Sequence, residues 1–198
     1  MARKRVAILI SGRGTNMAAL IETARDPSYP AEIALVISNI PSAKGLQIAQ
    51  AAEIKTIAIP HKDYSDKSMF EEQILQALNE AKIELVCLAG FMRVLSASFI
   101  SHFEGRILNI HPSLLPAFPG LDAQGQAVAH GVKVSGATVH FVDAGVDTGP
   151  VIRQVSVPVL PSDDEPTLHE RIKQVERVLL VDVVRDFAQD LVTYPQEA

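Results

Sequence analysis

Short apolar runs rich in β-branched residues alternate with helical patterns along the first half of the chain. Between these runs, apolar residues recur at intervals of three and four, as in helices that pack through one face. Strands that are separated by helices usually pair as parallel neighbours through right-handed crossovers. The pattern therefore predicts an α/β domain with a doubly wound, mostly parallel sheet. The predicted strands cover residues 5–10, 32–38, 56–60, 83–89 and 106–110.

The pattern changes after residue 111. A proline-rich loop and a short helix near residues 123–130 precede two strands, 135–143 and 149–159, which are separated by a brief turn. That spacing favours an antiparallel pair that extends the sheet. Residues 165–190 predict a closing C-terminal helix with one apolar face. Because we find no repeat or linker, we expect a single domain over residues 1–198.

Composition narrows the class of function. Of the 198 residues, 47% are hydrophobic, which is enough for a sizeable core, yet no apolar run approaches the ~20 residues of a membrane span. The single cysteine, Cys87, lies in an apolar run and cannot form an internal disulfide, so we expect a cytoplasmic protein. The formal net charge of −5, with both signs scattered, argues against a nucleic-acid surface. We therefore expect small-molecule chemistry without membrane or nucleic-acid partners.

Three segments follow predicted strands directly: 11–16, 90–93 and 109–111. In open α/β sheets, ligands bind outside the carboxyl ends of the strands. These segments are therefore the first places to look for a site.

A glycine loop occupies the first of these segments. Gly12 and Gly14 lie between a strand and a helix, where free backbone amides and the helix dipole favour an anion. The lysine of a P-loop is missing, and Met17 stands where a dinucleotide-binding loop has its third glycine. We expect a phosphomonoester site, with Thr15 and Asn16 as side-chain donors. The alternative is a tight turn in which one of these two side chains merely caps the helix.

A polar pair ends the fifth predicted strand. Asn109 and His111 are two residues apart, so in a continuing strand their side chains point to the same face. Prolines 112, 116 and 119 restrict the loop that follows. Asp147, in a glycine-rich turn, is the preferred carboxylate partner because small neighbours permit close approach. The alternatives are a satisfied core histidine and ordinary turn chemistry.

Other histidines carry no chemistry in this interpretation. His140 alternates with apolar neighbours in its strand and is expected to be structural, and His169 is assigned no role. No His or Cys pair has the spacing of zinc ligands, so we expect no metal.

Four segments, in this order and spacing, resemble the phosphoribosylglycinamide formyltransferase family, which is folate-dependent and acts in purine biosynthesis. They are "ISGRGTN", "LAGFMRVLS", "LNIHPSLLPAFPG" and "GATVHFVDAGVDTGPVI". The resemblance covers nearly the whole chain. It implies the formyltransferase fold and transfer of a formyl group from 10-formyltetrahydrofolate to the amine of glycinamide ribonucleotide, by a monomer or homodimer without a metal.

The resemblance also implies site residues by position. Asn109, His111 and Asp147 would form the catalytic set. The phosphate would be bound by Gly14, Thr15 and Asn16, and the ribose by Glu176. The folate pocket would include Phe91, Met92, Arg93, Val94, Leu95, Ile107, Val142, Ala144 and Gly145.

These residue types suit the chemistry. Asn109 and a protonated His111 can donate hydrogen bonds to the oxyanion of a tetrahedral intermediate. Asp147 can keep His111 charged and take the proton that the amine sheds, directly or through a water. Where many family members carry histidine soon after the Pro-Gly, this chain has Asp122 and Gln124. The extra carboxylate is expected either to raise an apparent pKa at Asp147 or to replace a lost hydrogen bond.

Three alternatives compete with this interpretation. Methionyl-tRNA formyltransferase and formyltetrahydrofolate hydrolase share formyl-folate chemistry, but each is expected to carry a further domain. A nucleotide-binding module without catalysis would use the glycine loop and leave Asn109, His111 and Asp147 without a role.

Overall fold

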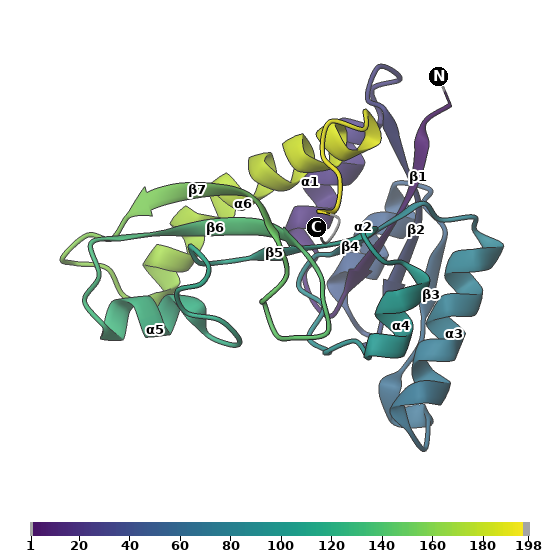
Figure 1. The fold of residues 1–198 in the computed structure, drawn as a ribbon, viewed down its shortest axis with the longest axis horizontal. Helices are drawn as coiled ribbons and strands as arrows, with labels where there is room; N and C mark the ends of the chain where they lie inside the picture. The colour runs from purple at the N-terminus through teal and green to yellow at the C-terminus, as the bar shows by residue number, and fades with distance from the viewer. Residues whose placement is uncertain (1, 196–198) are drawn as a thin grey trace.

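A computed structural model describes residues 2–195 as one seven-stranded sheet with helices on both faces (Figure 1). The strand order is β3-β2-β1-β4-β5-β6-β7. The first five strands are parallel, and β6 and β7 are antiparallel to their neighbours, which confirms the predicted fold class. The strands are β1 Lys4–Ile10, β2 Ala31–Ser38, β3 Thr56–Ala58, β4 Leu85–Leu88, β5 Ile107–His111, β6 Val134–Phe141 and β7 Val151–Pro158.

Strand β1 shows why both faces of the sheet are covered. Its side chains alternate between two apolar clusters, as the two-residue period of a strand requires. Ile8 packs in the cluster that contains α1, α2 and α6, whereas Leu9 packs with α3 and α4. A strand that is apolar on both faces is typical of a sheet between two helical layers. The helices are α1 Thr15–Ala24, α2 Lys44–Ala51, α3 Lys67–Glu80, α4 Ala97–His102, α5 Ala123–Ala129 and α6 Glu165–Ala188, with a short 3₁₀ helix at His61–Asp63.

Helix α6 closes the fold. It begins after Asp164, whose carboxylate accepts a hydrogen bond from the Thr167 amide at 2.9 Å. The predicted apolar face is buried, except that Val175 is only partly buried. The helix packs on α1 and on the β6–β7 pair, where it lies across the strands in Figure 1. This position brings a polar stripe of α6 close to the start of α1.

The parallel strands bring the three predicted segments to one edge of the sheet. Strands β1, β4 and β5 are adjacent, and their carboxyl ends lead into residues 11–16, 90–93 and 109–111. Strand β5 continues through His111, so Asn109 and His111 both belong to the strand. Side by side in the sheet, these strand ends form the base of the candidate site.

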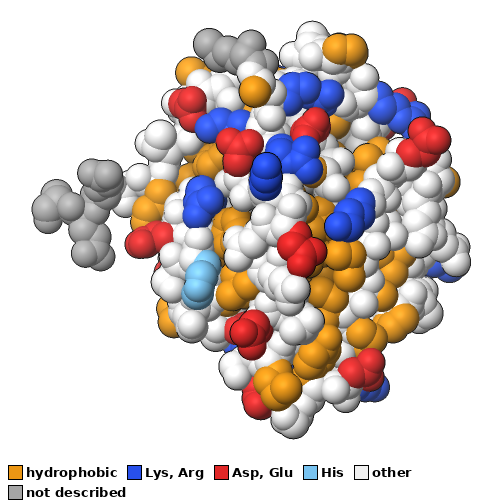
Figure 2. Space-filling view, turned by 90° about the vertical axis from the view of Figure 1, so that its right-hand side faces the viewer, with side chains coloured by type: hydrophobic (Ala, Val, Ile, Leu, Met, Phe, Trp, Pro, Cys, Tyr) orange, Lys and Arg blue, Asp and Glu red, His pale blue; other side chains and the backbone are white. Residues whose placement is uncertain are grey.

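Figure 2 shows one face of the molecule, on which Lys and Arg side chains are interspersed with Asp and Glu. Within residues 2–195, no helix is long and apolar enough to cross a membrane.

Candidate active site

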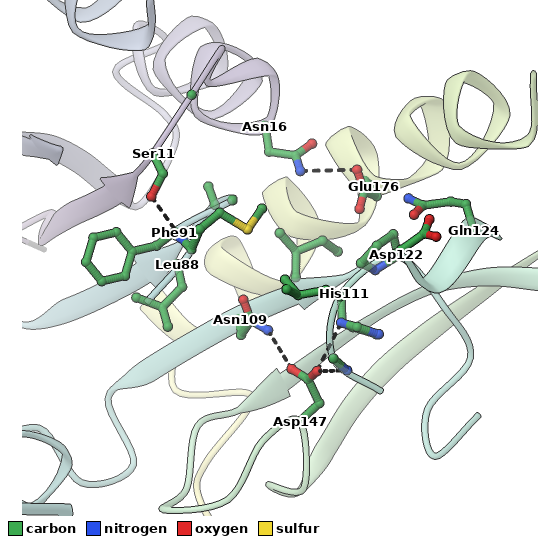
Figure 3. A pocket seen from close by; sticks show the side chains of 18 of the residues that line it. Ser11, Asn16, Leu88, Phe91, Asn109, His111, Asp122, Gln124, Asp147 and Glu176 are labelled. Atoms are coloured by element: carbon green, nitrogen blue, oxygen red, sulfur yellow. Dashed lines mark hydrogen bonds and ion pairs between the residues drawn. The ribbon is translucent and has the colours of Figure 1, made fainter. Parts of the chain in front are cut away.

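A cavity of about 990 Å³ lies at the carboxyl ends of β1, β4 and β5. Its walls come from the three predicted segments, the β6–β7 loop and α6. Figure 3 shows labelled side chains from these separate parts of the chain converging on the same space. A cavity of this size is typical of a small-molecule site.

The centre of the site is a cluster of Asn109, His111 and Asp147 (Figure 3). The Asn109 Nδ2 atom donates to Asp147 Oδ1 at 3.3 Å, and His111 Nδ1 lies 3.3 Å from Asp147 Oδ2. Asp147 sits in the β6–β7 loop with a φ of 54°, in the left-handed region that aspartate tolerates better than most residues. The structure thus brings together the three side chains that the sequence singled out.

The His111 ring lies between two acceptors. Its Nε2 atom donates to the Phe118 carbonyl at 2.8 Å, because a carbonyl oxygen can only accept. Its Nδ1 atom faces the Asp147 carboxylate, and the residue is only 4% exposed. A ring with protons on both nitrogens satisfies both contacts. The proline-rich loop therefore holds the histidine in place as well as following it.

The Asp147 carboxylate is held in its ionised form. Burial opposes ionisation, whereas the hydrogen bond from the Gly120 amide and the charge of His111 favour it, and the pKa of Asp147 lies below its usual range. The Gly120 amide donates to Asp147 Oδ2 at 2.8 Å. Asp147 is therefore available as a base at neutral pH.

Asp122 does not produce the perturbation that the sequence suggested. Its carboxylate caps α5 by accepting a hydrogen bond from the Gly125 amide at 3.1 Å. The pKa of Asp147 is lowered rather than raised, and the groups that shift it do not include Asp122. Gln124 is buried in the cavity wall.

His140 belongs to the site, although its apolar neighbours predicted a purely structural role. It lies opposite Asn109 in the β5–β6 register. Its Nε2 atom is 3.1 Å from Asn109 Nδ2 and 3.6 Å from Asp147 Oδ1. A buried histidine in a strand carries no sequence signal for this pairing, because the partner is set by the strand register.

The glycine loop opens α1 without a side-chain cap. Gly14 is the N-cap residue, so the alternative in which Thr15 or Asn16 caps the helix is not what the structure shows. Gly14 has a φ of 71°, and a Cβ atom there would lie 2.9 Å from Met17 Cε and 3.1 Å from Gly45 Cα. The positive φ would strain any other residue, and its Cβ would crowd the close approach of α1 and α2. Gly14, Thr15 and Asn16 all line the cavity.

Asn16 and Glu176 form a buried polar pair between α1 and α6 (Figure 3). Asn16 Nδ2 donates to Glu176 Oε2 at 3.3 Å, and Asn16 Oδ1 is buried without a hydrogen-bond partner among residues 2–195. Burial raises the pKa of Glu176, which is 7% exposed, and the Asn16 hydrogen bond opposes that shift. A buried acceptor without a partner at a cavity wall favours a ligand that donates hydrogen bonds.

Helix α6 contributes further polar residues for which the sequence indicated no role. His169 and Lys173 lie within two turns of Glu176 and line the same cavity, as does Arg13 of the glycine loop. Lys173 Nζ donates to Glu170 Oε1 at 2.6 Å. The spacing of 169, 173 and 176 is helical and places them on one face. That spacing is the sequence signal that could have identified them.

Residues 91–95 form the opposite wall of the cavity. Phe91 and Leu95 are buried, whereas Met92, Arg93 and Val94 are exposed, and all five line the cavity. The wall is fixed at one end by Ser11, whose Oγ accepts the Met92 amide at 2.8 Å. At the other end, Glu71 of α3 accepts hydrogen bonds from the amide and the hydroxyl of Ser96.

Four other residues were predicted for the same pocket. Val142 and Gly145 line the cavity. Ile107 does not: it is 1% exposed and packs in the apolar cluster under α3 and α4. Ala144 lies beside two lining residues but is not itself part of the wall. Among residues 2–195, no group of three His, Cys, Asp or Glu side chains is arranged to hold a metal ion.

Comparisons with known proteins agree with this geometry. Residues 4–184 match the formyl transferase family model. The chain is 40% identical to a phosphoribosylglycinamide formyltransferase of Bacillus subtilis, over 92% of this chain and 93% of that protein. It is 52% identical to the trifunctional purine biosynthetic protein adenosine-3 of Drosophila melanogaster, over 88% of this chain but only 13% of that much longer protein.

A solved structure shows the same likeness. The structure of a phosphoribosylglycinamide formyltransferase from Brucella melitensis superposes with a TM-score of 0.91 at 47% identity, over 98% of this chain and all of that one. The predicted family resemblance is thereby confirmed. The chain belongs to the formyl transferase family and, within it, to the phosphoribosylglycinamide formyltransferases.

Proposed function

We propose that this protein transfers the formyl group of 10-formyltetrahydrofolate to the amine of glycinamide ribonucleotide in de novo purine biosynthesis. The products are formylglycinamide ribonucleotide and tetrahydrofolate. The main support is the convergence of Asn109, His111 and Asp147 in one cavity. The glycine loop lines the same cavity and leads into α1, whose N-terminus has no side-chain cap. The printed names of the relatives support the ribonucleotide as substrate.

The ribonucleotide would occupy the α1–α6 side of the cavity. Gly14, Thr15 and Asn16 would bind its phosphate at the N-terminus of α1, where free amides and the helix dipole favour an anion. Glu176 would accept hydrogen bonds from the ribose hydroxyls. Asn16 Oδ1 supports this placement, because the atom is buried, lacks a partner in residues 2–195 and can accept from the same hydroxyls.

The folate would occupy the opposite side. Its ring would lie against the wall of residues 91–95, where the apolar residues Met92 and Val94 are exposed. Val142 and Gly145 would complete this pocket, with Ala144 supporting the β6–β7 loop. The two substrates would then meet at the Asn109, His111 and Asp147 cluster.

The reaction would pass through a tetrahedral intermediate. The substrate amine attacks the formyl carbon, a new C–N bond forms, and the carbonyl oxygen becomes an oxyanion. Asn109 and His111 would donate hydrogen bonds to this oxygen. His111 would exchange the neutral Phe118 carbonyl for the oxyanion, because hydrogen bonds to a charged acceptor are roughly twice as strong.

Proton transfer completes the reaction. Asp147 would take the proton that the amine sheds, directly or through a water, which neutralises its carboxylate. That loss of charge weakens its hold on the Asn109 N–H and frees this donor for the oxyanion. The C–N bond to the folate then breaks as the folate nitrogen receives a proton from His111. The amine is itself the nucleophile, so these steps need neither a metal nor a covalent enzyme intermediate.

We further propose that the chain acts as a single domain over residues 1–198, in the cytoplasm, as a monomer or homodimer. Its partners would be the two small-molecule substrates, without nucleic acid or membrane. The buried, unpaired Cys87 supports a reducing compartment.

The test is a spectrophotometric assay. The protein is incubated with 10-formyl-5,8-dideazafolate and glycinamide ribonucleotide, and release of the deformylated folate is followed in the ultraviolet. Turnover that requires the ribonucleotide is expected. Turnover without it would indicate a hydrolase, and no turnover would indicate a binding module; either result contradicts the proposal. The His111→Ala variant serves as the control for contaminating activity.

A further inference from the structure

His140 is a buried polar residue to which the proposed reaction gives no task. It is 2% exposed and its neighbours along β6 are apolar. A buried imidazole is costly unless both ring nitrogens find partners. The contacts of the two nitrogens therefore determine what this residue can do.

The first contact fixes the tautomer. His140 Nδ1 lies 2.8 Å from the carbonyl oxygen of Phe141, which can only accept, so the ring carries a proton on Nδ1. In the neutral ring, Nε2 then has a lone pair and no proton. It is an acceptor that faces Asn109 Nδ2 at 3.1 Å, whereas Asp147 Oδ1, at 3.6 Å, lies beyond hydrogen-bond distance.

The orientation of the Asn109 amide agrees independently. Its Nδ2 atom also lies 3.3 Å from Asp147 Oδ1. A flipped amide would place its oxygen against the Asp147 carboxylate, where two acceptors repel. Similarly, a second proton on His140 would place an N–H against the Asn109 amide hydrogens. These contacts are thus consistent with one arrangement of protons. His140 carries its proton on Nδ1, and the Asn109 amide donates one N–H to His140 Nε2 and the other to Asp147 Oδ1.

We propose that His140 is a positioning residue that anchors one N–H of Asn109, so that the other, once Asp147 releases it, is aimed at the reacting oxygen. The inference rests on the proposed function, because only the formyl-transfer reaction gives the second N–H an oxyanion to stabilise. Anchoring matters because a freely rotating amide must lose that freedom in the transition state, whereas an anchored one is preorganised. His140 itself does not touch the reacting atoms.

The kinetic test is a double-mutant cycle. The His140→Leu variant removes the acceptor and is expected to lower kcat about tenfold, the effect of losing one hydrogen bond, with KM for both substrates within about twofold. The His140→Gln variant retains an amide oxygen as acceptor and is expected to restore most of kcat. In an Asn109→Ala background, His140→Leu should cost less than about twofold further, because the residue it positions is gone.

Two kinetic results would overturn the proposal. One is a His140→Leu variant with wild-type kcat. The other is a full tenfold loss that persists in the Asn109→Ala background, because His140 would then act independently of Asn109. Thermal denaturation and ribonucleotide affinity, measured on each variant, show whether a loss of kcat comes from misfolding. A general loss of structure would raise KM as well, and Gln would not rescue it selectively.

A second measurement separates this inference from the proposed function. Long-range ¹H–¹⁵N correlation spectra of the unliganded 21.4 kDa protein report the tautomer of each histidine. We expect the neutral Nδ1–H form for His140, and the Nε2–H form would refute the anchoring contact. If the wild-type chain shows no turnover, the proposed function fails. The tautomer alone then decides whether His140 anchors Asn109.

Discussion

The Asp147→Asn substitution tests the centre of the proposed mechanism. It keeps the shape of the side chain but removes its charge and most of its basicity. In the structure, the Asp147 carboxylate accepts hydrogen bonds from the Gly120 amide and Asn109, and it faces His111 at 3.3 Å. An asparagine oxygen can keep one of these contacts, so the loop is expected to hold its position while the chemistry fails.

The expected loss of kcat combines two effects: the loss of a general base and the loss of the attraction between Asp147 and His111. Positioned general bases contribute between about 10² and 10⁴ to a rate. The attraction between the carboxylate and a charged His111 ring is about 5 kcal/mol at 3.3 Å with an effective dielectric constant of about 20. Only part of this attraction is specific to the transition state. We therefore expect kcat to fall about 10³-fold, which corresponds to about 4 kcal/mol, with little change in either KM.

The assay is steady-state turnover of 10-formyl-5,8-dideazafolate with glycinamide ribonucleotide. Asp143→Asn is the matched control, because Asp143 lies in the same loop and its carboxylate bonds the Gly145 amide and the Thr148 hydroxyl. It is expected to change kcat by less than about tenfold. The role assigned to this carboxylate would be refuted if kcat of Asp147→Asn stayed within tenfold of wild type, or if KM rose while kcat was unchanged.

Three further outcomes are expected. Thr15→Val should weaken ribonucleotide binding by about tenfold with little effect on folate, as measured by titration calorimetry, and an unchanged ribonucleotide affinity would refute the role of the hydroxyl. Gly14→Ala should destabilise the fold by about 1–3 kcal/mol in urea denaturation, because its φ is 71° and the new Cβ meets Met17; an unaffected midpoint would contradict the required close packing. Hydrogen bonding to Arg171 lowers the pKa of Asp163 to about 2, so the stability that this pair contributes is fully present above about pH 4 and is lost as the pH falls toward 2. Asp163→Asn should therefore flatten acid unfolding in that window, and an unchanged pH profile would show that the pair contributes nothing.

Local sequence patterns predicted the framework well. Apolar runs, helical periodicity and glycine positions are properties of neighbouring residues, so the strand order along the chain and the closing helix could be predicted. The two-residue period of a strand placed Asn109 and His111 on one face, and the structure keeps them there. The rule for carboxyl ends of parallel strands then located the cavity.

Ile107, which the family resemblance placed in the folate pocket, shows that a position on the correct strand face is not sufficient. This residue shares the strand period of Asn109 and His111, but α3 and α4 cover it. Asn109 and His111, further along the same face of β5, extend beyond the helical layer and line the cavity. Whether a residue on the correct face is core or site depends on where the covering helices end, which is a property of packing.

Short-range periodicity is enough to predict which elements form and which strand ends line the cavity. The hydrogen-bond partner of each polar group in the site depends instead on how distant segments pack. The Phe118 carbonyl reaches His111 through the path of one loop, and His140 meets Asn109 through an antiparallel register across 31 positions of sequence separation. Hydrogen bonds between distant segments depend on distances of a few tenths of an ångström, which no local pattern encodes.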